Sequence, residues 1–388
     1  MTRVYQNPDA QVGLRALIVG AGAYPGAKAP DRLVLKDLTS VPPSVLLLAR
    51  KLLTDWRGDL SQPLVSLDLL LSDPAGPATW PGYGAAGEIA AGSPLDAPSR
   101  AAIEAALGAV LAGATKDDGL LLLFCGHGVA KDERYFVPGD FGAQLNPWNV
   151  LINLDELALA LRQEPPRTQW LFWDCCANIP EQILNALGAI GSSPLPRDAG
   201  RLSAAVRTHG MLGQFRLASA ADGDEAFGVA EAPSRFMEML VEAVDGAGCD
   251  RRIDRKWQVY DAGIRSAIQT YADRTPGLAN PGFYRFVVPA STDTPVPMRF
   301  RQLPGPPRSI LIASSEPRRA LKKAALAVTR DGESIQQLPA PQPSAVLHLT
   351  LDPEREYQVT AAFEDGAVQT RPTFAYLPMA EPVEFAWP

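Results

Sequence analysis

Continuous apolar runs of strand length recur through the first three quarters of the chain. Parallel strands that are buried on both faces of a sheet have this uniform pattern, whereas a half-exposed strand alternates apolar and polar residues. We therefore expect each run to be a strand of a largely buried sheet, and residues 135–138 to form one arm of a small hairpin. The runs cover residues 15–20, 64–72, 120–125, 170–173, 215–220 and 284–289.

Segments with apolar residues at helical spacing separate most of these runs. One begins at Pro42 and Pro43, which favour the first turn of a helix, and another follows Asn153, a good cap with Glu156 three residues on. Strands that alternate with helices predict an α/β fold with a mostly parallel, three-layer sheet and helices on both faces. The expected helices cover residues 42–52, 99–113, 153–161, 235–244 and 257–271.

The pattern changes after residue 290. Residues 291–308 contain five prolines and no clear periodicity, which predicts a linker. Short alternating runs follow, separated by turn signals such as Asp331-Gly332. They cover residues 309–313, 326–329, 345–351, 357–363 and 382–387. We expect an α/β domain over residues 1–290, the linker, and a small all-β sandwich over residues 309–388.

Composition and charge narrow the class of protein. The chain has 388 residues, of which 46% are hydrophobic, so it can bury a substantial core. Its net charge of −7 argues against nucleic acid or an anionic membrane as the main partner. Residues 1–13 lack the apolar segment of a secretory signal, and no apolar run approaches the roughly 18 residues of a membrane span. We expect a soluble, cytoplasmic protein.

Two of the apolar runs end in chemically reactive residues. One is followed by Cys125-Gly126-His127-Gly128 and the other by Asp174-Cys175-Cys176. Because ligands and catalytic groups in open α/β sheets lie beyond the carboxyl ends of the strands, neighbouring strands would bring a histidine and a cysteine to one edge. Three of the four cysteines lie at these two ends, which favours reduced, functional thiols over a disulfide framework.

His127 and Cys176 are the candidate pair for thiol chemistry. A thiol needs a neighbouring imidazole or another cationic partner to become a thiolate at neutral pH, and His127 is one of three histidines in the chain. Side chains alternate along a strand, so Asp174 and Cys176 should point to one face and Cys175 to the other. The adjacent glycines allow a substrate carbonyl to approach, and the Gly128 N–H is a candidate oxyanion donor.

A metal site is the alternative for the same residues. Cys125, His127, Cys175 and Cys176 are suitable ligand types, but the chain lacks a CxxC pair and adjacent cysteines of a strand point to opposite faces. We therefore favour catalysis without a metal or other cofactor, and expect Cys125 and Cys175 to fill the core. The sequence also lacks an EF-hand-like calcium loop.

Taken together, Gly126-His127-Gly128 and Asp174-Cys175-Cys176 resemble the dyad motifs of the caspase-like cysteine peptidases of clan CD, peptidase family C14, and of their bacterial, metacaspase-like branch in particular. The separation of 49 residues is close to the roughly 50 of caspases. Tyr24 after the first strand, and Ser234-Arg235-Phe236 at the start of a helix, are similar to the family as well. The resemblance covers roughly residues 14–290 and implies a caspase-like three-layer α/β fold.

The resemblance implies a catalytic role for each matching residue. Cys176 is the nucleophile and His127 the general acid and base. The backbone N–H groups of Gly128 and Cys176 form the oxyanion hole. Asp174 lines the S1 pocket and selects Arg or Lys at the cleavage position, so the implied function is that of a cysteine endopeptidase acting on proteins or peptides.

Other acidic residues are candidates for the substrate pocket. A second S1 acid is expected in the loop after the first strand, where Asp31 and Asp37 lie. Asp222 and Asp224 belong to an acidic cluster that follows the run at 215–220, and they are candidates for the pocket rim.

One departure from the family leaves a second function open. Family members usually follow the cysteine with a segment that contains Ser-Gly, whereas this chain has Ala177-Asn178-Ile179. The alternative is a catalytically inactive caspase-like scaffold that binds a partner protein through the β-sandwich.

Regulation is a further implication of the resemblance, because many relatives are latent until proteolysis or a ligand orders their loops. Residues 191–214 contain Arg197, Arg201 and Arg207, which are sites for a cut by the chain itself or by an upstream protease. The expected partners are thus a substrate and an activating protease or regulatory protein. Bacterial stress, cell death and antiviral defence are the pathways in which such relatives act.

Overall fold

The computed structural model describes most of the chain. It covers residues 2–28, 34–130, 133–144, 146–175, 190–196, 198, 200–201, 204–205, 212–219, 231–251, 256–274, 297–342, 347–376 and 380–386. By the proximity of their residues, Met1–Val241 and Arg285–Met298 form one compact unit, and Glu242–Tyr284 and Arg299–Pro388 a second. The domain division at residues 290 and 308 stays a prediction.

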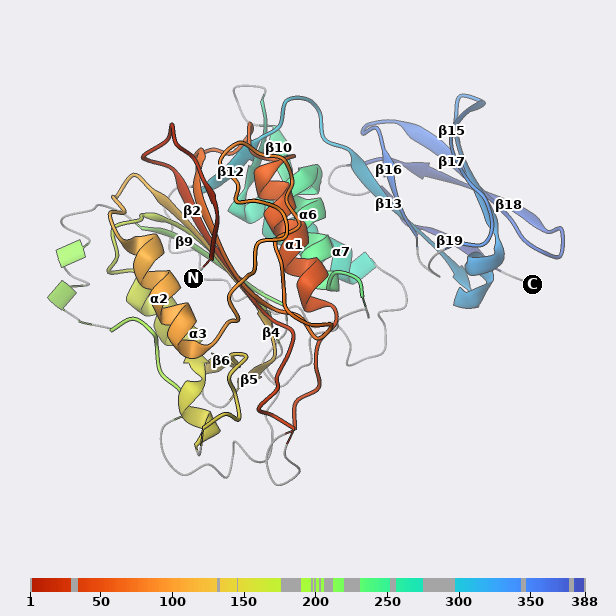
Figure 1. Ribbon diagram of the computed structural model, residues 1–388. Coiled ribbons are helices and arrows are strands. Elements are labelled where there is room, and N and C mark those ends of the chain that lie inside the picture. Colours follow the sequence, from red (N-terminus) through yellow and green to blue (C-terminus); the bar gives the residue numbers. More distant parts are fainter. Residues whose placement is uncertain are drawn as a thin grey trace. The chain divides into compact units, whose positions relative to one another are not determined.

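A six-stranded sheet lies at the centre of the first unit (Figure 1). Its strands, in spatial order, are β1 (Thr2–Gln6), β3 (Leu64–Ser72), β2 (Leu14–Ala21), β4 (Gly119–Gly126), β8 (Thr168–Cys175) and β9 (Gly213–Ala218). All neighbouring pairs are parallel except β1 with β3, which is antiparallel. The predicted mostly parallel α/β fold is therefore confirmed, and the short edge strand β1 was not expected.

Helices cover both faces of this sheet, as expected (Figure 1). Helices α2 (Arg100–Leu111) and α3 (Leu154–Leu161) lie on one face, and α1 (Val41–Leu53) and α6 (Arg235–Glu242) on the other. The packing of α1 is so close that a Cβ added at Gly20 of β2 would lie 2.9 Å from Val45 Cγ1. The strands are thus buried from both sides, which explains why their sequences are mostly apolar.

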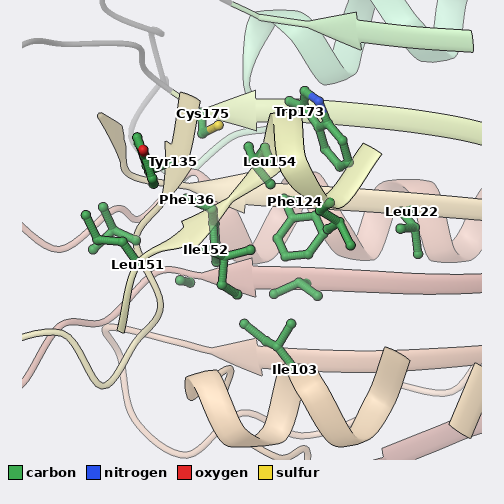
Figure 2. Packing of buried hydrophobic residues seen from close by; sticks show 14 of the residues in the cluster. Ile103, Leu122, Phe124, Tyr135, Phe136, Leu151, Ile152, Leu154, Trp173 and Cys175 are labelled. Atoms are coloured by element: carbon green, nitrogen blue, oxygen red, sulfur yellow. The ribbon is translucent and has the colours of Figure 1, made fainter. Parts of the chain in front are cut away.

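The core under α2 and α3 continues into a small three-stranded sheet made of β5 (Gly128–Ala130), β6 (Arg134–Phe136) and β7 (Ile152–Asn153). Figure 2 shows Phe124 and Phe136 packed together here, with ring centroids 5.0 Å apart. The antiparallel pairing of β5 with β6 confirms the predicted hairpin. The central sheet and the small sheet therefore share one apolar cluster.

The predicted capping signal of α3 is confirmed. The Asn153 side chain accepts a hydrogen bond from the Glu156 N–H at 2.9 Å, so one of the otherwise unpaired amides of the first turn is satisfied. Ser99 does the same for α2 by accepting from the Ala102 N–H.

The expected helix over residues 257–271 was wrong in its first part. Residues 257–260 form a strand, β11 (Trp257–Tyr260), and only the rest of the expected helix is helical, as α7 (Asp261–Arg274). Strand β11 pairs with β10 (Cys249–Arg251) on one side and with β12 (Arg299–Gln302) on the other. The expected strand at 284–289 lies outside the described residues.

The predicted C-terminal β-sandwich is confirmed as two sheets around one core. One sheet has the order β16 (Leu347–Leu351), β13 (Ser309–Glu316), β19 (Val383–Ala386), and the other β15 (Glu333–Leu338), β14 (Ala325–Arg330), β17 (Glu356–Ala362), β18 (Val368–Phe374). Residues of both sheets, such as Leu311 and Val359, fill the space between them. Strands β15 and β18 were missed because they are largely exposed edge strands with few apolar residues, and β18 contains Pro372.

Within the described part of the chain, every helix is too short or too polar to cross a lipid bilayer.

The core cluster yields a prediction for stability. Leu122 lies fully buried in β4, so Leu122→Ala should lower the free energy of unfolding by about 3 kcal/mol through lost burial and the cavity left behind. Chemical denaturation followed by tryptophan fluorescence measures this change. Val12→Ala is the control, because Val12 is 46% exposed and its truncation should change the value by less than about 0.5 kcal/mol. Equal effects of the two changes would contradict the position of Leu122 in the core.

Candidate active site

The strands that carry the two reactive motifs are neighbours in the sheet. β4 and β8 run parallel, with Cys125 opposite Asp174 and Gly126 opposite Cys175. His127 and the residue after Cys175 therefore leave the sheet at the same edge, as the motifs predict. Cys176 and Ala177-Asn178-Ile179 lie outside the described residues, so the approach of Cys176 to His127 stays a prediction.

The backbone of His127 is fixed by Tyr24 and by the turn that leads to Val137. The His127 N–H donates a hydrogen bond to Tyr24 Oη at 2.9 Å, and its carbonyl accepts one from the Val137 N–H at 2.9 Å. A Cβ at Gly126 would lie 2.9 Å from Tyr24 Oη. Glycine at position 126 is thus needed for the buried tyrosine to reach the histidine backbone.

The imidazole of His127 is oriented by a backbone carbonyl. Its Nε2 lies 2.8 Å from the carbonyl oxygen of Lys36, which can only accept, so Nε2 carries the proton and the lone pair of the neutral ring is on Nδ1. The Tyr24 ring lies beside the imidazole, with centroids 5.0 Å apart. The side chain is thereby held in the tautomer in which Nδ1 can accept a proton.

Burial lowers the pKa of His127, and this effect outweighs the hydrogen bond to Lys36 and the nearby Asp37 carboxylate, both of which raise it. Burial also acts on Asp37, in the direction of a higher pKa. Hydrogen bonds from the Lys28 ammonium and the Tyr24 N–H, each 2.9 Å long, outweigh that effect and lower the pKa of Asp37. Asp37 is therefore an anion near a histidine that is mostly neutral at pH 7.

Of the two candidates for a second S1 acid, the structure describes Asp37 alone. Its carboxylate is engaged by Lys28 and the Tyr24 backbone, so a substrate cation would compete with Lys28 for it. Asp31 lies outside the described residues, as do Asp222 and Asp224. The S1 and rim roles of these acids stay predictions.

Asp174 is buried on the face of the sheet that α1 and α6 cover. Only 5% of it is exposed. Its Oδ2 accepts hydrogen bonds from Ser234 Oγ at 2.5 Å and from Cys125 Sγ at 3.5 Å. Burial raises the pKa of Asp174, although hydrogen bonds from Ser234, Cys125 and Ser219 partly offset this. Ionising Asp174 therefore costs stability as the pH rises through its raised pKa.

Cys125 of β4 and Cys175 of β8 point to opposite faces of the central sheet. Cys175 is fully buried in the cluster under α2 and α3, as Figure 2 shows, whereas Cys125 faces Asp174. Burial raises the pKa of Cys125 well above the usual thiol range. Cys125 and Cys175 therefore cannot ligate one ion together, and among the described residues no group of three metal-ligating side chains occurs.

Gly128 begins β5 directly after His127 and is buried. This position is compatible with an oxyanion donor beside His127, but the oxyanion role of Gly128 and Cys176 stays a prediction.

Hydrogen bonds attach Ser192, which follows the segment after β8, to α2 and to β7. The sequence did not predict this attachment. The Arg100 guanidinium of α2 donates to Leu151 O at 2.6 Å and to Ser192 Oγ at 2.9 Å. The Asn153 N–H also donates to Ser192 O. Arg100 thus anchors the far end of the chain segment that contains Cys176, and a single arginine at the start of a helix carries no sequence signal for that role.

No family model matches the sequence, and no curated protein matches it. Among solved structures, the chain is similar to the crystal structure of caspase-1 from Spodoptera frugiperda, with 15% identity and a TM-score of 0.38 over 70% of this chain and 81% of that chain. A TM-score this low supports no argument about family or activity, so the functional proposal depends on the motifs and the geometry.

The imidazole geometry predicts an unusual titration. His127 should titrate below the usual histidine value of about 6.5, because burial favours the neutral ring. Asp37→Asn should lower the pKa further, since the carboxylate favours the charged imidazole and an amide does not. Proton NMR of the three histidines measures both effects, with His209 and His348 as internal references. A His127 pKa that rises in Asp37→Asn would contradict this electrostatic arrangement.

The thiols should differ in reactivity. Alkylation requires an accessible thiolate, and Cys125 and Cys175 are both buried, whereas Cys249 is half-buried. Iodoacetamide at pH 8 should therefore modify Cys249 in the native protein and leave Cys125 and Cys175 unmodified, with all of them reacting after denaturation. Peptide mass spectrometry reads out each site. Rapid native modification of Cys125 would show that this thiol is not enclosed beside Asp174.

Proposed function

We propose that this protein is a caspase-like cysteine endopeptidase that uses Cys176 and His127. The observation that carries the proposal is the His127 imidazole. It lies at the edge of the sheet where β4 and the cysteine strand β8 end side by side, and the Lys36 carbonyl holds it in the tautomer of a general base.

The mechanism is acyl transfer through a thioester. Nδ1 of His127 takes the proton of the Cys176 thiol, and the thiolate attacks the scissile carbonyl carbon. The N–H groups of Gly128 and Cys176 bind the oxyanion of the tetrahedral intermediate. As the C–N bond breaks, His127 gives the proton to the leaving amine, and water then hydrolyses the thioester with His127 as base.

The proposed specificity is for Arg or Lys at the cleavage position. Asp174 supplies the negative charge, with Asp222 and Asp224 at the rim of the pocket. A carboxylate in a nearly water-free site interacts more strongly with a cation than it would in water. Asp174 is such a residue, because only 5% of it is exposed.

Activation by cleavage within residues 191–214 belongs to the same proposal. Of the three arginines there, the structure describes Arg201, whose side chain is 53% exposed and pairs with Glu164 at 3.3 Å. Arg197 and Arg207 lie outside the described residues. We infer a metacaspase-like, latent protease of the bacterial cytoplasm, which an upstream protease or regulatory protein activates in stress, cell death or antiviral defence.

A partner-binding scaffold is the second candidate, and one feature of the β-sandwich favours it. A hollow of about 560 Å³ at one end of the four-stranded sheet is lined by Asp331, Glu356 and Glu381 beside the Phe374 ring. The basic residue in its lining, Arg330, is held by Asp352 at 3.5 Å. The unbalanced acidic side chains suit a basic segment of a partner protein.

The decisive experiment compares fluorogenic peptides with Arg, Lys or Asp at the cleavage position, before and after limited proteolysis of the protein. Wild type should cleave the Arg and Lys peptides, and Cys176→Ala or His127→Ala should lower kcat/KM at least about 1000-fold, because the dyad acts as a unit. Cys175→Ala is the matched control, since it removes the adjacent thiol on the opposite face of the strand.

The outcomes separate the two candidate functions. Cleavage after Asp alone would keep the protease and overturn the specificity proposed for Asp174. Covalent labelling of Cys176 by a peptide with an electrophilic warhead would exclude the inactive scaffold. If the proteolysed wild type cleaves none of the peptides and Cys176 stays unlabelled, the proposed protease activity is overturned.

A further inference from the structure

Ser234 joins three elements beside the candidate site through hydrogen bonds of fixed direction. Its N–H donates to Ser44 Oγ of α1 at 2.8 Å, and its Oγ accepts from the Met237 N–H of α6 at 3.1 Å. The Ser44 hydroxyl proton goes to Ser40 O at 2.7 Å. Since a hydroxyl has one proton to donate, that of Ser234 is left for Asp174 Oδ2, 2.5 Å away.

The side chains of Ser234 and Cys125 both donate to one oxygen of the Asp174 carboxylate. Cys125 Sγ lies 3.5 Å from the same oxygen of Asp174. The Ser219 hydroxyl also favours the charged carboxylate, although its proton is shared with Cys175 O, 3.4 Å away. Among the described residues, the titratable group that faces Asp174 is the Cys125 thiol of β4, while Ser219 after β9 and Ser234 directly before α6 supply neutral hydroxyls. An ionised carboxylate only accepts hydrogen bonds, so every one of these donors favours its charged form.

We propose that Ser234 is a positioning residue for substrate selection, whose hydroxyl opposes protonation of Asp174 and orients its carboxylate towards an incoming Arg or Lys side chain. The inference rests on the proposed function, in which Asp174 reads the cleavage position. Burial alone would let Asp174 take up a proton, and a neutral acid has little preference for a guanidinium over an uncharged group of the same shape. The Ser234 hydroxyl opposes that protonation.

The two roles of Ser234 can be separated by mutation. Its oxygen caps α6, whereas its proton serves Asp174. Glycine is nearly as good a cap as serine but has no hydroxyl, so Ser234→Gly removes the hydrogen bond to Asp174 and keeps the start of the helix. Ser234→Thr retains both. Ser99→Gly is the matched control, because it removes the hydroxyl that caps α2.

The first test measures kcat/KM from pH 5 to 9 for two peptides that differ only in arginine or citrulline at the cleavage position. Ser234→Gly should lower the arginine-to-citrulline ratio about ten-fold at the acid end of this range, because a hydrogen bond to a charged group is lost. The ratio should recover as the pH rises and Asp174 ionises. Ser234→Thr should restore the wild-type profile, and Ser99→Gly should leave the ratio unchanged.

The second test needs no turnover. The protonated carboxyl group of Asp174 has an infrared C=O band that Asp174→Asn identifies by its loss. Titrating this band should show that Ser234→Gly raises the pKa of Asp174, whereas Ser99→Gly does not. In a protein that cleaves neither peptide, an unchanged titration in Ser234→Gly overturns the inference and a raised pKa supports it.

The outcomes distinguish this inference from the proposed function. A wild type that cleaves both peptides equally would overturn selection by Asp174, and the role of Ser234 with it. A wild type that prefers arginine, with the same preference in Ser234→Gly, would overturn Ser234 alone. An equal loss on both peptides, independent of pH, would show that Ser234 is merely structural.

Discussion

The parallel pairing of β4 with β8 is the constraint on which the candidate site depends. Its register places Cys125 opposite Asp174 and Gly126 opposite Cys175, which decides the residues that share a face. A slip by one residue would turn every side chain of a strand to the other face, exposing Asp174 to the apolar cluster of α2 and α3. That cluster, with Phe124 and Trp173 at its centre, excludes a carboxylate and thereby fixes the register.

His127 is oriented mainly by the backbone of other segments. The Lys36 carbonyl, the Tyr24 hydroxyl and the Val137 amide each hold one of its polar groups. A histidine whose Nε2 partner is a carbonyl gains less stabilisation of its charged form than one whose partner is a carboxylate. This arrangement suits a base that must be neutral before it reacts, and it leaves Asp37, whose carboxylate favours the charged ring, in a secondary role.

The sequence predicted those parts of the fold in which one pattern dominates. Mostly apolar runs identified the five parallel strands, because burial on both faces favours apolar side chains. The edge strands β1, β15 and β18 lack that pattern, so they were missed. Residues Trp257 to Tyr260 were misassigned because bulky apolar residues three apart fit a helix face as well as a strand that is paired on both sides.

For the site, sequence identified the residues that form local motifs and missed those whose role comes from long-range contacts. His127 and Asp174 follow recognisable strands. The Lys36 carbonyl has no sequence signal, since any residue supplies one, and Arg100 contacts Ser192 across 92 positions. Cys125 is buried, as expected, yet it donates to a carboxylate as well as filling space.

The hydrogen bonds of Arg100 to Ser192 and Leu151 determine what a cut in the chain after Ser193 would change. The stretch between Cys175 and Ser192 is attached to the same rigid unit at both ends, by β8 on one side and by Arg100 and Asn153 on the other. A break in the chain beyond Ser193 would therefore leave that stretch a closed loop, and its closure entropy, which depends on the number of residues between fixed ends, would not change. The break would instead affect the residues between the cut and β9, which would then be joined to the unit at one end only.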